Sequence, residues 1–117
     1  MADVLKNQTF ISTGTGNSDT HLVVPNSSST KTVLSIVMCN VDTDDCEFDL
    51  YMAGDPEGAT NGNDNYRVYN QQSLPAGATF IHNSKVVVTN GLALTFIQRQ
   101  STAAATIHVT TSYLDQT

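Results

Sequence analysis

The 117-residue sequence has no tryptophan, two cysteines, and only five lysine and arginine residues against eleven aspartate and glutamate residues. The net charge of −6 repels phosphate, and no basic stripe offsets it, so neither nucleic acid nor an anionic membrane is expected as a partner. No apolar run approaches the roughly 20 residues that a membrane-spanning helix needs. The acidic balance favours solubility instead.

The first seven residues do not combine a basic segment with a following apolar one, so we expect no signal peptide and synthesis in a cytoplasm. Cys39 and Cys46 flank a short connection, which makes a disulfide conceivable. The face pattern of the flanking segments, however, puts the two side chains on opposite sides of a sheet. Together with a reducing compartment, this predicts free thiols.

Glutamate and lysine are scarce, whereas threonine, serine, asparagine, glycine and valine are abundant. β-Branched residues favour strands, and asparagine, serine and glycine favour turns. The length suits one domain covering residues 1–117. We therefore predict a single all-β domain.

Short apolar blocks separated by turn residues recur along the chain, with the spacing of a sandwich or barrel. They span 4–11, 21–24, 32–39, 46–52, 66–72, 78–82, 85–89, 92–97 and 105–114. The block at 66–72 is weak. The pattern predicts about eight strands in two antiparallel sheets packed face to face, as in a β-sandwich of the jelly-roll type.

Two blocks show side-chain alternation with a period of two, which is typical of strands with one buried and one solvated face. In 32–39 the buried side is predicted to carry Leu34, Ile36 and Met38. In 46–52 the buried positions alternate with Glu47, Asp49 and Tyr51, which are predicted to face solvent. Asn90-Gly91 between two further blocks is the strongest hairpin signal, because it suits a type I′ turn.

No residue pattern indicates a reaction or a bound cofactor. A dense acidic group lacks the spacing and the glycine of an EF-hand, so a solvated loop and outer sheet face is favoured over calcium binding. This group is Asp42, Asp44, Asp45, Glu47 and Asp49. His21, His82 and His108 lie outside any known nucleophile motif and are expected to face solvent or a neighbouring subunit. We predict no metal, no cofactor and no enzymatic activity.

Two groups of residues are candidates for binding. Residues 1–12 are a possible N-terminal arm whose apolar side chains pack against a neighbour, or else an ordinary edge strand; these side chains are Val4, Leu5, Phe10 and Ile11. Tyr51, Tyr66 and Tyr69 are an alternative candidate, as an aromatic platform for a glycan.

From about residue 7 onward, the sequence resembles small virion structural proteins of tailed bacteriophages, especially cyanophages. The resemblance rests on Thr32–Asn40, the acidic strand Glu47–Tyr51, Leu74-Pro75-Ala76-Gly77, Asn90-Gly91 and Ile107–Leu114. These strand and turn patterns are moderately specific and contain no catalytic residue.

In that class, β-sandwich proteins commonly decorate the capsid as cement proteins, often as trimers, and others belong to necks, tails or fibres. The resemblance therefore implies a capsid decoration protein on the virion surface that bridges shell subunits. Its implied partners are the major capsid protein and further copies of itself, as a homotrimer. Tail, neck or fibre components and a glycan-binding module that recognises a host surface are the alternatives.

Overall fold

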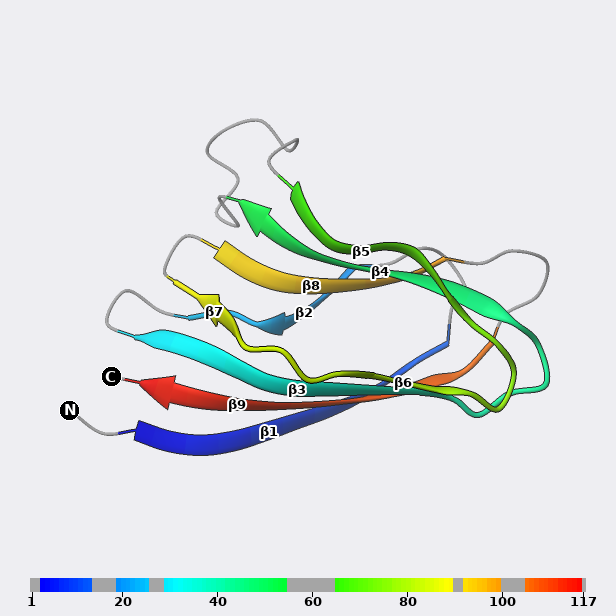
Figure 1. Cartoon of the computed structure of the whole chain (residues 1–117), viewed down its shortest axis with the longest axis horizontal. Helices are drawn as coiled ribbons and strands as arrows, with labels where there is room; N and C mark the ends of the chain where they lie inside the picture. Colours follow the sequence, from blue (N-terminus) through cyan, green and yellow to red (C-terminus); the bar gives the residue numbers. More distant parts are fainter. Residues whose placement is uncertain are drawn as a thin grey trace.

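The structure is a computed structural model of the chain. It describes residues 3–13, 19–25, 29–54, 65–89, 92–99 and 105–116. Within them the chain forms nine strands and no helix (Figure 1). The strands are β1 (Asp3–Ser12), β2 (Asp19–Val23), β3 (Thr30–Asn40), β4 (Cys46–Gly54), β5 (Asn65–Leu74), β6 (Thr79–His82), β7 (Val86–Val88), β8 (Leu92–Arg99) and β9 (Ile107–Gln116).

The strands form two antiparallel sheets that pack face to face. The five-stranded sheet has the order β1-β9-β3-β6, with β7 also paired to β3, and the four-stranded sheet has the order β2-β8-β4-β5. Successive strands alternate between the sheets except at β4–β5 and β6–β7. This is the double Greek-key order of a jelly roll, with one edge strand split into β6 and β7. The predicted all-β sandwich is confirmed, and the split strand brings the number to nine.

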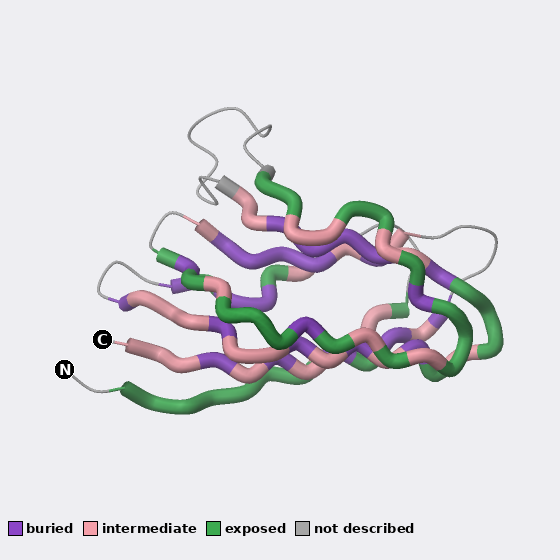
Figure 2. Tube along the Cα trace, in the orientation of Figure 1, coloured by how far each residue is buried: buried purple, intermediate pink, exposed green. Residues whose placement is uncertain are grey.

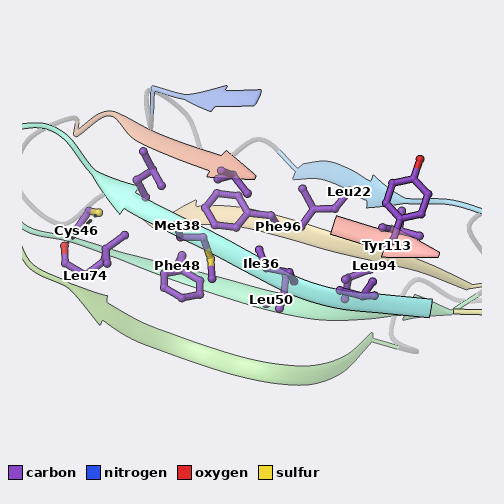
Figure 3. Packing of buried hydrophobic residues seen from close by; sticks show 14 of the residues in the cluster. Leu22, Ile36, Met38, Cys46, Phe48, Leu50, Leu74, Leu94, Phe96 and Tyr113 are labelled. Carbon is purple, nitrogen blue, oxygen red and sulfur yellow. Dashed lines mark hydrogen bonds between the residues drawn. The ribbon is translucent and has the colours of Figure 1, made fainter. Parts of the chain in front are cut away.

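The core lies between the two sheets and is built by buried apolar side chains from both of them (Figure 3). The Phe48 ring of the four-stranded sheet stacks on Phe96, with centroids 5.7 Å apart, and meets Phe80 of the opposite sheet edge-on at 5.5 Å. Such offset and edge-to-face pairs add to the stabilisation that comes from buried apolar area. Ile36 and Met38 of β3 are fully buried against this cluster.

One end of the sandwich is closed by Asn40, which is fully buried although polar. Its Nδ2 donates to the carbonyl oxygens of Asp44 at 2.8 Å and Leu74 at 3.0 Å, and its Oδ1 accepts from the Asp42 amide at 3.0 Å. The adjoining turn from Pro75 is closed by a hydrogen bond from the Ala78 amide at 3.0 Å and has Gly77 at φ 75°, as a type II turn requires at that position.

Two local predictions are corrected by this topology. The register of β3 shifts between Val33 and Ser35, so Val33 rather than Leu34 is fully buried in line with Ile36 and Met38. β7 and β8 do not pair as a hairpin, because β7 pairs with β3 and β8 with β4. The intervening 90–91 lie outside the described residues. A sequence-local turn signal shows that the chain reverses, but it does not show which sheet the next strand joins.

The two cysteines are free, and they belong to different sheets. Cys39 in β3 pairs with His108 on the outer side of the five-stranded sheet, whereas Cys46 in β4 is buried in the core. The connection between them therefore crosses from one sheet to the other and is not a hairpin. The prediction of free thiols on opposite sides agrees with the structure, although the single sheet assumed for it does not.

Candidate interaction surface

The outer side of the five-stranded sheet is built by the residues that alternate with its core residues. Because directly opposed residues share a face, the register links them into rows that run across the sheet. One row is Leu5, Leu114, Thr32 and Val87; a second is Thr9, Thr110, Val37 and Ile81; a third is Ile11, His108, Cys39 and Thr79.

These rows leave large apolar side chains in contact with water. Leu5 is 69% exposed, Ile11 61%, Ile81 59% and Val87 54%, and Val37 and Leu114 beside them are half-buried. We call these six residues the apolar face. Exposed apolar patches of this kind mark surfaces that other proteins cover.

Charge is nearly absent from the apolar face, although the protein is acidic. Four residues in the strands of this sheet carry a charge, and only Asp3, at a corner, stands in an outward-facing row. The other three point to the inner side. There Lys6 pairs with Asp115 at 3.1 Å, and the Nζ of Lys31 lies 5.4 Å from the centroid of the Tyr113 ring. Depletion of charge is typical of the core of a protein interface.

A shallow concavity of about 540 Å³ lies at one end of this sheet. It is lined by Thr9, Phe10, Ile11, His108, Val109 and Thr110, all from β1 and β9. These residues bring one imidazole and two hydroxyl groups to an otherwise apolar hollow. The arrangement suits contact with a protein side chain.

The outer side of the four-stranded sheet is polar by contrast. The Asp49 carboxylate, whose side chain is fully buried, accepts from Arg99 Nη2 at 2.6 Å and lies 3.5 Å from Arg67 Nη1. Its other oxygen accepts the Gln71 amide at 2.6 Å, at a bulge where Gln71 has φ 52°. The prediction that Asp49 faces solvent is therefore wrong, because two arginines and a bulge amide enclose it.

Of the other acidic residues in the predicted cluster, Asp42 and Asp45 accept backbone hydrogen bonds, Asp44 is exposed and Glu47 is half-buried. Asp45 accepts the Ala76 amide at 2.9 Å, and Asp42 accepts the Thr43 amide at 2.7 Å. Among the described residues, no group of three or more histidine, cysteine, aspartate or glutamate side chains is placed to hold a metal ion. Nor do these residues form a helix long and apolar enough to cross a membrane.

The histidines lie in three different environments. His21 contacts Thr95 Oγ1 at 2.9 Å on the outer side of the four-stranded sheet, and His108 is exposed on the apolar side of the other sheet. His82 is buried in the interior, where its Nδ1 lies 2.8 Å from the Tyr69 hydroxyl. The expectation of solvent-facing histidines is wrong for His82.

The three candidate tyrosines do not share a surface. Tyr66 is exposed, Tyr51 is buried beneath Arg67, whose guanidinium carbon is 4.6 Å from its ring centroid, and Tyr69 packs edge-on against Phe80 in the interior. A stacking platform for a glycan needs coplanar exposed rings. The structure does not bring these rings together in that way.

The four N-terminal candidates differ in exposure. Residues 3–12 form an edge strand paired to β9 along its whole length, so this segment is integral to the sheet. Val4, Leu5 and Ile11 are exposed, whereas Phe10 turns inward and meets Phe96 edge-on at 5.6 Å. Phe10 is therefore a core residue, and the accessible part of the group is the other three.

The remaining members of the apolar face, Val37, Ile81, Val87 and Leu114, were not predicted. For Val37 and Leu114 a signal was present. The segments 32–39 and 107–114 contain no charged residue on either alternating face, in a protein with eleven acidic residues. A strand with one solvated face normally carries charge on it.

The fold places the chain among antiparallel jelly-roll sandwiches. No protein-family model matches the chain, and no curated protein matches it. Among solved structures, it is similar to a chain described as "Structure of infectious bursal disease virus Gx strain", with a TM-score of 0.46 and 10% sequence identity. The match covers 97% of this chain but only 36% of the viral chain, so this protein spans about a third of the length of that neighbour.

Proposed function

We propose that this chain is a virion structural protein, and specifically a decoration protein that binds the capsid shell of a tailed bacteriophage through the apolar face. The observation that carries the proposal is the nearly uncharged outer side of the five-stranded sheet, with exposed apolar side chains, in a protein of net charge −6. Such a surface is costly to leave in water and is complementary to another protein surface.

The size of this surface suits a specific contact. Four strands at a spacing of about 4.8 Å and a length of about ten residues at 3.3 Å give a sheet face of roughly 600 Å². Covering it would remove roughly 1,200 Å² from the two partners together, which is the lower range of stable protein interfaces. Bound at high copy number, such a protein stabilises the shell by mass action.

The sequence resemblance supports the same assignment. Two of its segments, Thr32–Asn40 and Ile107–Leu114, lie in β3 and β9, the central strands of the five-stranded sheet. These strands contribute Val37 and Leu114 to the apolar face. The part of the chain that resembles virion proteins thus overlaps the surface proposed to bind.

The first test is the copy number of the protein in purified particles of the virus that encodes it. Quantitative mass spectrometry against the major shell protein is expected to give hundreds of copies per particle, located on the head in an electron-microscope map. A few copies at one vertex or along the tail would assign a neck, tail or fibre role. Absence from the particle would overturn the virion role.

The second test is direct binding to isolated heads that lack the protein. Val37→Glu and Ile81→Glu place charge in the apolar face and are expected to weaken binding at least tenfold. Val41→Glu is the matched control, because Val41 is also exposed but lies in the β3–β4 connection. Equal binding by all three folded variants would show that the apolar face is not the contact surface.

A further inference from the structure

β1 is an unprotected sheet edge. It is the terminal strand of the five-stranded sheet, and within the described part of the chain its backbone pairs with β9 alone (Figure 1). The first seven of its ten residues are exposed (Figure 2). A row of unpaired amide and carbonyl groups on such a strand is a template for another strand.

The other three edges carry features that discourage pairing. β2 is five residues long and has a register shift after His21, and β5 has two register shifts and a left-handed residue, Gln71. The edge formed by β6 and β7 is interrupted between them, where Lys85 is exposed. Short length, bulges and lysine are the usual protection of sheet edges.

β1 has none of these features over most of its length. Its ten residues pair with β9 in one unbroken register, and it contains no proline. Asp3 and Lys6 are its only charged residues, and Lys6 is held across its own sheet by Asp115 at 3.1 Å. Residues 7–12 therefore offer a continuous, uncharged edge of the kind that accepts a strand from a partner.

We propose that β1 pairs antiparallel with β1 of a second copy of this chain, about a two-fold axis at Gln8. Leu5 and Ile11 are the exposed apolar residues of β1 on the outer side, and each lies three positions from Gln8. Pairing about Gln8 sets Leu5 of each copy opposite Ile11 of the other copy. Opposed apolar side chains on one face stabilise such a pairing.

The two neighbouring registers in which outward residues still oppose outward residues do not pair Leu5 with Ile11. With the axis at Asn7, Ile11 would face the Asp3 carboxylate of the second copy. With the axis at Thr9, Leu5 would face a residue beyond the end of β1, which stops at Ser12. The register about Gln8 uses residues 4–12 of both strands and opposes no like charges.

The pairing joins the two five-stranded sheets into one continuous sheet and makes their apolar faces contiguous. It does not depend on capsid binding, because it uses the strand edge rather than the outer side of the sheet. A two-fold contact also differs from the homotrimer that the sequence resemblance implies. The mass of the free protein therefore discriminates between the two assemblies.

The experiment is site-specific cross-linking of the purified full chain, combined with mass measurement by light scattering. Gln8→Cys, in a Cys39→Ser background, places two thiols directly opposite each other within disulfide range. Oxidation is expected to give a covalent dimer. Val4→Cys is the matched control: it lies on the same strand and face, but its two copies would be roughly eight residues, or about 26 Å, apart.

Charge exchange tests the register independently. Leu5→Lys and Ile11→Glu are each expected to weaken dimerisation about tenfold, and the double variant to restore it, because each lysine then faces a glutamate of the other copy. Both positions are exposed, so the monomer should still fold. A monomer or trimer at every concentration, equal cross-linking through Val4→Cys, or additive losses in the double variant would each overturn the proposal.

Discussion

Arg99 donates two hydrogen bonds to Oδ2 of Asp49, from Nε at 2.8 Å and from Nη2 at 2.6 Å. The two residues come from adjacent strands, β8 and β4, on the outer side of the four-stranded sheet. The Asp49 side chain has no exposed surface, whereas that of Arg99 is 37% exposed. Ionic contacts thus hold the outer side of the four-stranded sheet, whereas the outer side of the five-stranded sheet carries almost no charge.

Asp49→Ala is expected to lower the free energy of unfolding by about 1–3 kcal/mol, the usual range for hydrogen bonds to a charged group. The Gln71 amide loses its acceptor, but the half-exposed arginines regain water, which keeps the loss below that of a fully buried pair. Urea denaturation measures the change. Asp44→Ala, at an exposed acidic residue of the preceding loop, is the control and should have little effect. Equal losses in both variants would contradict this role of Asp49.

The buried thiol of Cys46 predicts a loss of stability in alkali. Burial, reinforced by Asp45 and Glu47, raises the pKa of this thiol from 9.0 to about 11. Above pH 9 the unfolded chain releases the proton while the folded chain retains it, so stability falls as the pH rises from 9 to 11 and levels off beyond. Two pKa units at about 1.4 kcal/mol each make this contribution about 3 kcal/mol. Cys46→Ala should flatten this part of the stability profile, and an unchanged profile would contradict the assignment.

Thiol labelling of the native protein is expected to modify one cysteine rapidly and the other only after unfolding. Cys39 lies half-buried in an outward-facing row, whereas Cys46 is buried and shares the Leu74 carbonyl with Asn40. A disulfide-exchange reagent should therefore react with one thiol per folded chain. Cys39→Ser should remove the fast reaction and Cys46→Ser should not. Rapid labelling of Cys46 and slow labelling of Cys39 would contradict the burial of the two thiols.

The same thiol can report whether the apolar face is covered in an assembled particle. Cys39 stands between His108 and Thr79 in the row that includes Ile11. If a capsid shell covers this side, labelling of Cys39 in intact particles should be at least tenfold slower than in the free protein. Equal rates would show that this row stays open to solvent.

The N-terminal strand is expected to respond differently on its two faces. Phe10→Ala should lower the free energy of unfolding by about 2 kcal/mol, because the ring packs on Phe96 and the vacated space is partly enclosed. Leu5→Ala should change it by less than about 0.5 kcal/mol, because Leu5 is mostly in water. Thermal unfolding at a concentration where the chain is monomeric gives both values. Similar losses at the two sites would mean that β1 is packed differently.

Most strands were predictable because the period of two is a local property. The segment at 46–52 shows it plainly, and β4 indeed begins at Cys46. Even the weak block at 66–72 lies within the ten residues of β5. The bulges were not predictable, because an extra residue such as that at Leu34 or Gln71 changes the face of its neighbours without an obvious local mark.

The candidate surface was predictable only in part. Leu5 and Ile11 were recognised, but they had been grouped with Phe10, which faces the core. Val37 lies in β3, which is distant in sequence from the strands of Ile81 and Val87, although both β6 and β7 pair with β3 in the sheet. The sequence of a single strand shows that it has two faces. Only the packing of the folded sheet decides which side chains gather on its exposed side.

The sequence by itself determined the β character, the strand and turn positions, and the scarcity of charge in the segments that became β3 and β9, because these follow from local side-chain chemistry. Tertiary structure alone decided which sheet each strand joins, that Asp49 is enclosed by Arg99, and that β1 is left as an open edge. These outcomes depend on contacts between residues far apart in the chain. No local pattern encodes such contacts, and they arise only when the two sheets close over a common core.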